Sequence, residues 1–161
     1  MSLVLHNEAI YDICNQKLDI ERPTYTNINK IIAQVVSGMT VSLRYYDSLN
    51  VDLYEFNKNL VPFPKVHFLL SSYAPFLSTV RAYHKDPSVF DITDLAFDSA
   101  HMMAKCDPTN GRYIACNLKY MGDVIPKDAN AAIIKAREKL RIQSADWWYV
   151  GIRCGFCYNA Q

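Results

Sequence analysis

The stretch "TYTNINKIIAQVVSGMTVSLRYY", residues Thr24–Tyr46, carries the strongest periodic signal in the chain. Apolar side chains recur along it at helical spacing, namely Ile28, Ile31, Ile32, Val35, Val36, Met39 and Leu43. Gly38 and several β-branched residues lower its intrinsic helix propensity. A long helix with poor propensity and wide apolar cover is typical of one that packs on several sides. We therefore expect this helix to lie at the centre of the fold.

Shorter patterns surround this helix. They predict helices over 7–18, with Asn7 as the N-cap, then over the residues after Asn50, over 89–99 and over 126–140. They predict strands over 65–73, 111–124 and 146–159, the first of them buried. This order favours an α/β fold, arranged in α+β layers, with at least three strands.

The composition is that of an ordinary globular domain, with 17 basic and 16 acidic residues among 161. No basic block points to nucleic acid, and no apolar run is long enough to cross a membrane. The first ten residues do not form a signal peptide. Five cysteines without a framework spacing are typical of reduced thiols in a cytoplasmic protein.

Most catalytic motifs have no counterpart in this sequence. The CxxC at Cys154–Cys157 falls in a predicted strand, whereas a redox pair needs a helix N-terminus to activate the first thiol. The four histidines have no ligand spacing, so we expect no metal site. Among five glycines there is no Walker A or other phosphate-binding loop, so these residues offer no cradle for a triphosphate.

Two groups of polar residues stand out. In "SLNVDLYEFNKNLVPFP", residues 48–64, Asp52 and Glu55 are three apart and share one face of a predicted short helix. They are either a solvated face or acids that act on a molecule this chain does not itself hold. Tyr25 and Asn29 could stack on a purine and hydrogen-bond to its edge, or simply belong to a helix cap.

Longer segments identify a family. The sequences "NEAIYDIC", "LDIERPTYTNIN", "LNVDLYEF", "NLVPFPKVHF", "KCDPTNGRYIAC" and "GDVIPKDANAAI" occur in the order and at the spacing found in tubulins. The chain resembles tubulin from about Asn7 to Tyr158. It is most similar to the α subunit, because Glu55 of "LYEF" is a glutamate there and a lysine in the β subunit. The segment "GDVIPKDANAAI" is also α-like, whereas "VPFP" and "MMAKCDP" are closer to β.

The resemblance implies a domain plan. Residues 1–46 would be the C-terminal helices of the nucleotide-binding domain, including the central core helix. Residues 47–161 would be part of the intermediate domain, with a mixed sheet of at least three strands and flanking helices. The family's glycine-rich phosphate loop and acidic tail would lie outside these residues, and we expect the natural chain to continue past Gln161.

The resemblance also implies a function. The chain would be a GTP-binding structural subunit of microtubules, in the cytoplasm, with β-tubulin, neighbouring subunits and microtubule-associated proteins as partners. Glu55 would assist the water that attacks the GTP of a neighbouring β subunit, and Asp52 would lie in the same contact. GTPase activity would then exist only in the polymer.

Further residues receive family roles. Asn7, Tyr25 and Asn29 match positions that contact the guanine of the chain's own GTP, which is bound with Mg²⁺ in intact family members. Because the phosphates contribute most of the affinity, we expect weak or no GTP binding by this chain. The loop Tyr73–Asp86 would make lateral contacts through Tyr83 and His84, and the helix that starts at Pro126 would lie at a longitudinal interface.

Two alternatives remain open from the sequence. The chain could be a truncated, non-polymerising interaction module that binds tubulin or another partner without turnover. It could also be a free-standing redox or hydrolytic domain, although no motif supports that hypothesis.

Overall fold

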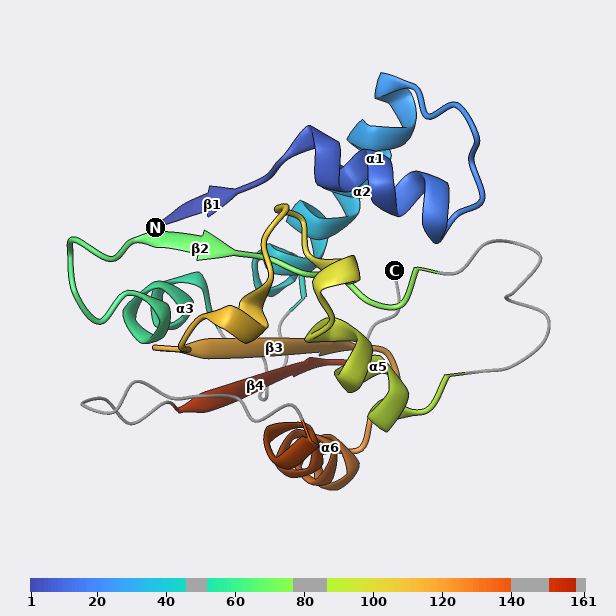
Figure 1. Cartoon of the computed structure of the whole chain (residues 1–161). Helices are drawn as coiled ribbons and strands as arrows, with labels where there is room; N and C mark the ends of the chain where they lie inside the picture. Colours follow the sequence, from blue (N-terminus) through green and yellow to red (C-terminus); the bar gives the residue numbers. More distant parts are fainter. Residues whose placement is uncertain (46–51, 77–86, 140–150, 159–161) are drawn as a thin grey trace.

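The computed structural model describes residues 1–45, 52–76, 87–139 and 151–158 (Figure 1). Its helices are α1 (Asn7–Gln16), α2 (Tyr25–Met39), α3 (Leu53–Leu60), α5 (Val89–Ala96) and α6 (Pro126–Lys139). Its strands are β1 (Ser2–Val4), β2 (Phe68–Leu70), β3 (Cys116–Met121) and β4 (Ile152–Cys157). Short 3₁₀ turns span Val41–Leu43, Ser99–His101 and Pro108–Asn110.

The strands form two separate parallel pairs. β1 pairs with β2 in the register that sets Leu3 opposite Leu69, and β3 pairs with β4 with Leu118 opposite Cys154. The α/β class is confirmed. The sequence predicted one mixed sheet, whereas the described residues form two pairs and one antiparallel bridge between Ser72 and Met102.

β2 differs from its prediction as a buried strand. It has only three residues, and the side chains of Phe68 and Leu70 are 67% and 53% exposed. The continuous apolar run that predicted burial therefore leaves two large side chains in solvent. Its partner β1 was not predicted, because three residues are too few to show a period.

α2 is shorter than the predicted helix. Thr24 and Asn27 form a capping box at its start, in which the Asn27 side chain accepts from the Thr24 backbone N–H at 3.1 Å. At the other end the Thr40 hydroxyl donates to the Val36 carbonyl at 2.9 Å, and a 3₁₀ turn follows. The β-branched, hydroxylated residue at this position helps to end the helix at Met39.

α2 packs on two sides, as expected for a central helix. Its buried residues Ile28 and Ile31 face α1. Gly38 lies against β3, since a Cβ added there would sit 3.4 Å from the sulfur of Met121.

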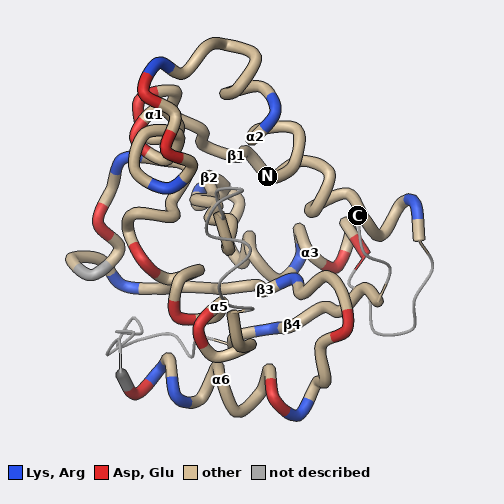
Figure 2. The backbone as a smooth tube through the Cα atoms, turned by 90° about the vertical axis from the view of Figure 1, so that its right-hand side faces the viewer, with Lys and Arg blue, Asp and Glu red and all other residues tan. Residues whose placement is uncertain are grey.

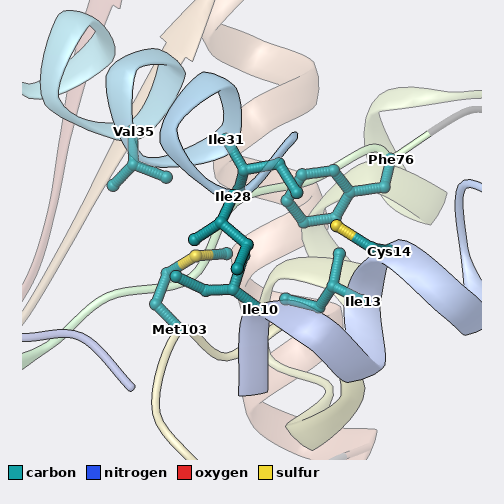
Figure 3. Close-up of a cluster of buried hydrophobic side chains, with 8 residues drawn as sticks. All are labelled: Ile10, Ile13, Cys14, Ile28, Ile31, Val35, Phe76 and Met103. Atoms are coloured by element: carbon teal, nitrogen blue, oxygen red, sulfur yellow. The ribbon is translucent and has the colours of Figure 1, made fainter. Parts of the chain in front are cut away.

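The larger core lies between α1 and α2 (Figure 3). It consists of Ile10, Ile13, Cys14, Ile28, Ile31, Val35, Phe76 and Met103, each at most 8% exposed. Figure 3 shows the α1 side chains directed toward those of α2, with Phe76 and Met103 at either side. This core fixes the relative position of the two helices.

A second cluster joins β3, β4 and the helices α5 and α6. The rings of Tyr120 and Phe156 stack with centroids 5.6 Å apart, over the fully buried Ala129. The Tyr120 hydroxyl lies 2.8 Å from the Thr93 hydroxyl of α5. The predicted helices at 89–99 and 126–140 and strands at 111–124 and 146–159 are confirmed over the bounds given above.

Candidate functional site

The acidic pair stands at the start of α3. Asp52 is the N-cap: its backbone is extended and its carboxylate accepts the Leu53 N–H at 2.7 Å. The prediction that Asp52 and Glu55 both belong to the short helix is therefore wrong for Asp52, which precedes it. A capping carboxylate satisfies one of the donors that a helix start leaves unpaired.

Glu55 occupies the first turn of α3, and its side chain is exposed. The partial positive charge of a helix N-terminus favours a carboxylate at this position. Its neighbour Tyr54 is 74% exposed, whereas Phe56 is 8% exposed and turns inward. α3 thus presents an acid and an aromatic ring outward while one ring anchors it.

A lysine from β3 supports the inner side of α3. The Lys119 ammonium lies 5.4 Å from the centroid of the Phe56 ring and donates to the Met39 carbonyl at 2.9 Å. Burial lowers the pKa of Lys119, and the negative charge of Asp52 opposes this shift. Sequence analysis missed Lys119, because only the fold brings β3 beneath α3.

The three residues assigned to guanine lie on α1 and α2. Asn7 is the first residue of α1, and His6 occupies the N-cap position, so the prediction of Asn7 as the cap is wrong. Tyr25 begins α2 and is 72% exposed, and Asn29 lies one turn later, also exposed. The cap of α2 is made by Thr24 and Asn27 instead, so neither Tyr25 nor Asn29 serves as a cap.

The structure does not bring the two groups together. Figures 1 and 2 place α3, which follows Asp52 and carries Glu55, away from α1, the helix that begins with Asn7. A hollow of about 400 Å³ beside α1 is lined by Asp12, Lys105, Cys106 and Asp107, among others. None of the predicted acids and guanine-binding residues lines it. Tyr83 and His84, the predicted lateral contacts, lie outside the described residues.

Comparison with protein families decides what this fold is. The model of the tubulin C-terminal domain matches residues 64–161, more than half of the chain. The chain belongs to the tubulin family.

The match to tubulin covers the elements from β2 to β4. It makes the chain a tubulin-like protein of the cytoskeleton, and tubulin chains interact with other tubulin subunits. The five residues assigned above all precede residue 64, so their roles rest on resemblance and geometry.

Further features of this tubulin chain are its cysteines, its possible metal ligands and the lengths of its helices. All five cysteines are described and none forms a disulfide, and burial raises the pKa of the Cys154 thiol. Within the described ranges, no three His, Cys, Asp or Glu side chains are grouped so as to hold a metal ion. In the same ranges no helix has both the length and the apolar character to span a membrane. Acidic and basic segments alternate along the chain in Figure 2.

Proposed function

We propose that this chain is an α-type tubulin subunit that supplies Glu55 in trans for hydrolysis of the GTP held by a neighbouring β subunit. The observation that carries the proposal is the exposed Glu55 in the capped first turn of α3. Among the residues that the structure describes, no Lys, Arg or His forms an ion pair with the Glu55 carboxylate. The wider role is that of a cytoplasmic microtubule constituent, in a heterodimer with β-tubulin and open to microtubule-associated proteins.

The chemistry needs two surfaces. A carboxylate can orient or deprotonate a water molecule, but phosphoryl transfer also needs contacts that neutralise the phosphates and Mg²⁺. In this proposal the β subunit supplies the nucleotide and its Mg²⁺, and this chain supplies the acid. Hydrolysis then follows assembly, because the two surfaces meet only in the polymer.

Asp52 supports this role from the adjacent position. Its carboxylate is engaged with the Leu53 N–H, which holds the first turn in place beside Glu55. We assign Asp52 to the same intersubunit contact, with Glu55 as the group that addresses the water.

The residues for the chain's own nucleotide fit the base of GTP. The exposed Tyr25 ring can stack on guanine, and the amides of Asn7 and Asn29 offer donors and acceptors for its edge. The 161 residues contain no glycine-rich loop for the phosphates. We therefore expect this chain by itself to bind GTP weakly.

The test is GTP turnover in microtubules assembled from the chain in its full natural length. The variant is Glu55→Ala, and the matched control is Glu21→Ala, an exposed acid in the connection between α1 and α2. We expect Glu55→Ala to lower hydrolysis about 100-fold or more, the lower end of what general acid–base groups contribute, while the polymer still forms.

Three outcomes separate the hypotheses. Loss of turnover with intact assembly supports the in-trans acid. Unchanged turnover would make Glu55 a surface carboxylate and overturn the proposal. If the unmodified chain does not enter the polymer, the non-polymerising interaction module is favoured.

A further inference from the structure

Lys119 of β3 lies on the face of the strand that packs against α2 and α3, where a strand between packed elements would usually carry an apolar side chain. On β3, Leu118 and Tyr120 face the cluster with α5 and α6, so Lys119 faces the opposite side, toward α2 and α3. The side chain of Lys119 is half-buried. Lysine takes such a position only when its ammonium group has partners.

The partners of Lys119 come from two helices. Its ammonium group donates to the carbonyl of Met39, the last residue of α2, at 2.9 Å. The last carbonyls of a helix lack intrahelical donors and lie at the negative end of its dipole, so a cation is favourable there. The same ammonium lies 5.4 Å from the centroid of the Phe56 ring of α3, within the range of a cation–π contact.

These contacts converge on the first turn of α3. Phe56 follows Glu55 directly, and its ring is 8% exposed, which makes it the anchor of this short helix. The charge of Asp52, the N-cap, also acts on Lys119. A helix of eight residues has little stability of its own and depends on such tertiary contacts.

We propose that Lys119 is a positioning residue for Glu55, since it fixes the first turn of α3 against the C-terminal end of α2. This inference rests on the proposed function of Glu55. Lys119 does not touch the reacting water; it acts through Phe56 and the cap. Because α2 carries Tyr25 and Asn29, the same contact joins the helix of these two guanine-assigned residues to the helix of the acid.

The test uses variants of Lys119 in the full natural chain, assembled with its partner. Lys119→Met keeps the length and the apolar stem but removes the charge and the donors. Lys119→Arg keeps the positive charge and the hydrogen-bond donors, and it serves as the rescue variant. The matched control is Lys135→Met, because Lys135 of α6 makes a comparable contact, 5.3 Å from the Phe90 ring of α5, away from α3.

Two measurements are made on each variant. Amide hydrogen exchange reports the protection of Leu53–Leu60 before assembly, and single-turnover hydrolysis per incorporated subunit reports the position of Glu55. We expect Lys119→Met to speed exchange in α3 about fivefold or more, because one hydrogen bond and one cation–π contact are lost. Hydrolysis should fall about tenfold or more, because small misplacements of catalytic groups are costly.

The controls make the role specific. Lys119→Arg should restore both values to within about twofold, because its guanidinium keeps the charge and the donors. Lys135→Met should leave exchange in α3 unchanged. If Lys119→Met does not fold, Phe56→Leu removes the aromatic ring that Lys119 contacts and part of the buried anchor, and it should give the same two changes.

Failure of this inference can be told from failure of the proposed function. If Glu55→Ala abolishes hydrolysis while Lys119→Met hydrolyses at the normal rate, Lys119 is not a positioning residue and the inference is overturned. Unchanged exchange in α3 would overturn it as well. If Glu55→Ala has no effect, the proposed function is wrong, and the exchange result alone decides whether Lys119 holds α3.

Discussion

The two buried hydroxyl groups between α5 and β3 allow a quantitative prediction. Thr93 and Tyr120 are 1% and 8% exposed, and their oxygens lie 2.8 Å apart. The Thr93 hydroxyl also lies 2.7 Å from the Val89 carbonyl, to which it donates. A threonine has a single hydroxyl proton, so Tyr120 must be the donor of the bond between the two hydroxyls. Burial raises the pKa of Tyr120, so its proton is retained at neutral pH.

This direction makes the two single substitutions unequal. Tyr120→Phe removes one hydrogen bond but leaves the Thr93 donor engaged, so we expect a loss of about 1 kcal/mol in the free energy of unfolding. Thr93→Val removes the acceptor and leaves a buried phenol without a partner, which costs about 2–3 kcal/mol. In the double variant no orphaned hydroxyl remains, and we expect its cost to be below the sum by about 1 kcal/mol.

The assay is urea denaturation of the purified chain followed by far-UV circular dichroism. The midpoints give the differences in free energy if the slope is unchanged among the four proteins. A larger cost for Tyr120→Phe than for Thr93→Val would refute the assigned donor. Strict additivity in the double variant would show that the two hydroxyls do not interact.

Three further predictions concern the core, a buried histidine and a cap. Ile28→Ala should cost about 2–5 kcal/mol in urea denaturation, because Ile28 is 1% exposed between two helices. Burial and, less strongly, Lys17 lower the pKa of His101, which Asp98 at 3.6 Å only partly offsets. The unfolded chain therefore takes up the proton first, so stability should fall as pH drops below about 6.5, and His101→Phe should flatten this dependence in denaturation series at several pH values. Asp52→Ala should cost α3 about 1 kcal/mol in local amide exchange, whereas Asp52→Asn should cost little.

Each of these predictions has a contradicting result. A cost below about 1 kcal/mol for Ile28→Ala would mean that the α1–α2 core relaxes around the change, unlike most buried sites. A pH dependence that is unchanged in His101→Phe would place the titrating group elsewhere. Equal exchange in Asp52→Ala and Asp52→Asn would show that the carboxylate does not cap α3.

The elements that the sequence predicts well are those with a complete local pattern. α6 starts at Pro126, a residue suited to the first helical turn, and carries an amphipathic repeat, so its prediction is confirmed. The helix that starts at Val89 has a capping box at its start: the Ser88 hydroxyl accepts the Asp91 N–H at 3.2 Å, and the Asp91 carboxylate accepts the Ser88 N–H at 3.3 Å. Such signals are contained within four residues, and no tertiary contact is needed to interpret them.

The features that the sequence did not predict depend on long-range contacts. The approach of Lys119 to Met39 and Phe56 joins three elements that are far apart in the chain. Asp52 was predicted within the short helix but caps it, because its carboxylate accepts the Leu53 N–H. The sequence spacing does not show on which side of a helix start such a residue lies. For Tyr25 and Asn29 the residue types left purine binding and a helix cap both open, and the assignment of Asn7, Tyr25 and Asn29 to guanine came from the resemblance.

The parallel pairing of the strands bears on how the chain folds. β1 must find β2 across the whole of α1, α2 and α3, and β3 must find β4 across α6, so each pair closes a long loop. Closing such a loop lowers the entropy of the chain before the distant contacts can stabilise it. Topologies of this kind therefore fold slowly. By contrast, α1 and α2 are neighbours in sequence and can form the first stable contact. We therefore expect refolding to begin with the α1–α2 pair, and the capped turn of α3 to reach its final place only after β3 has docked.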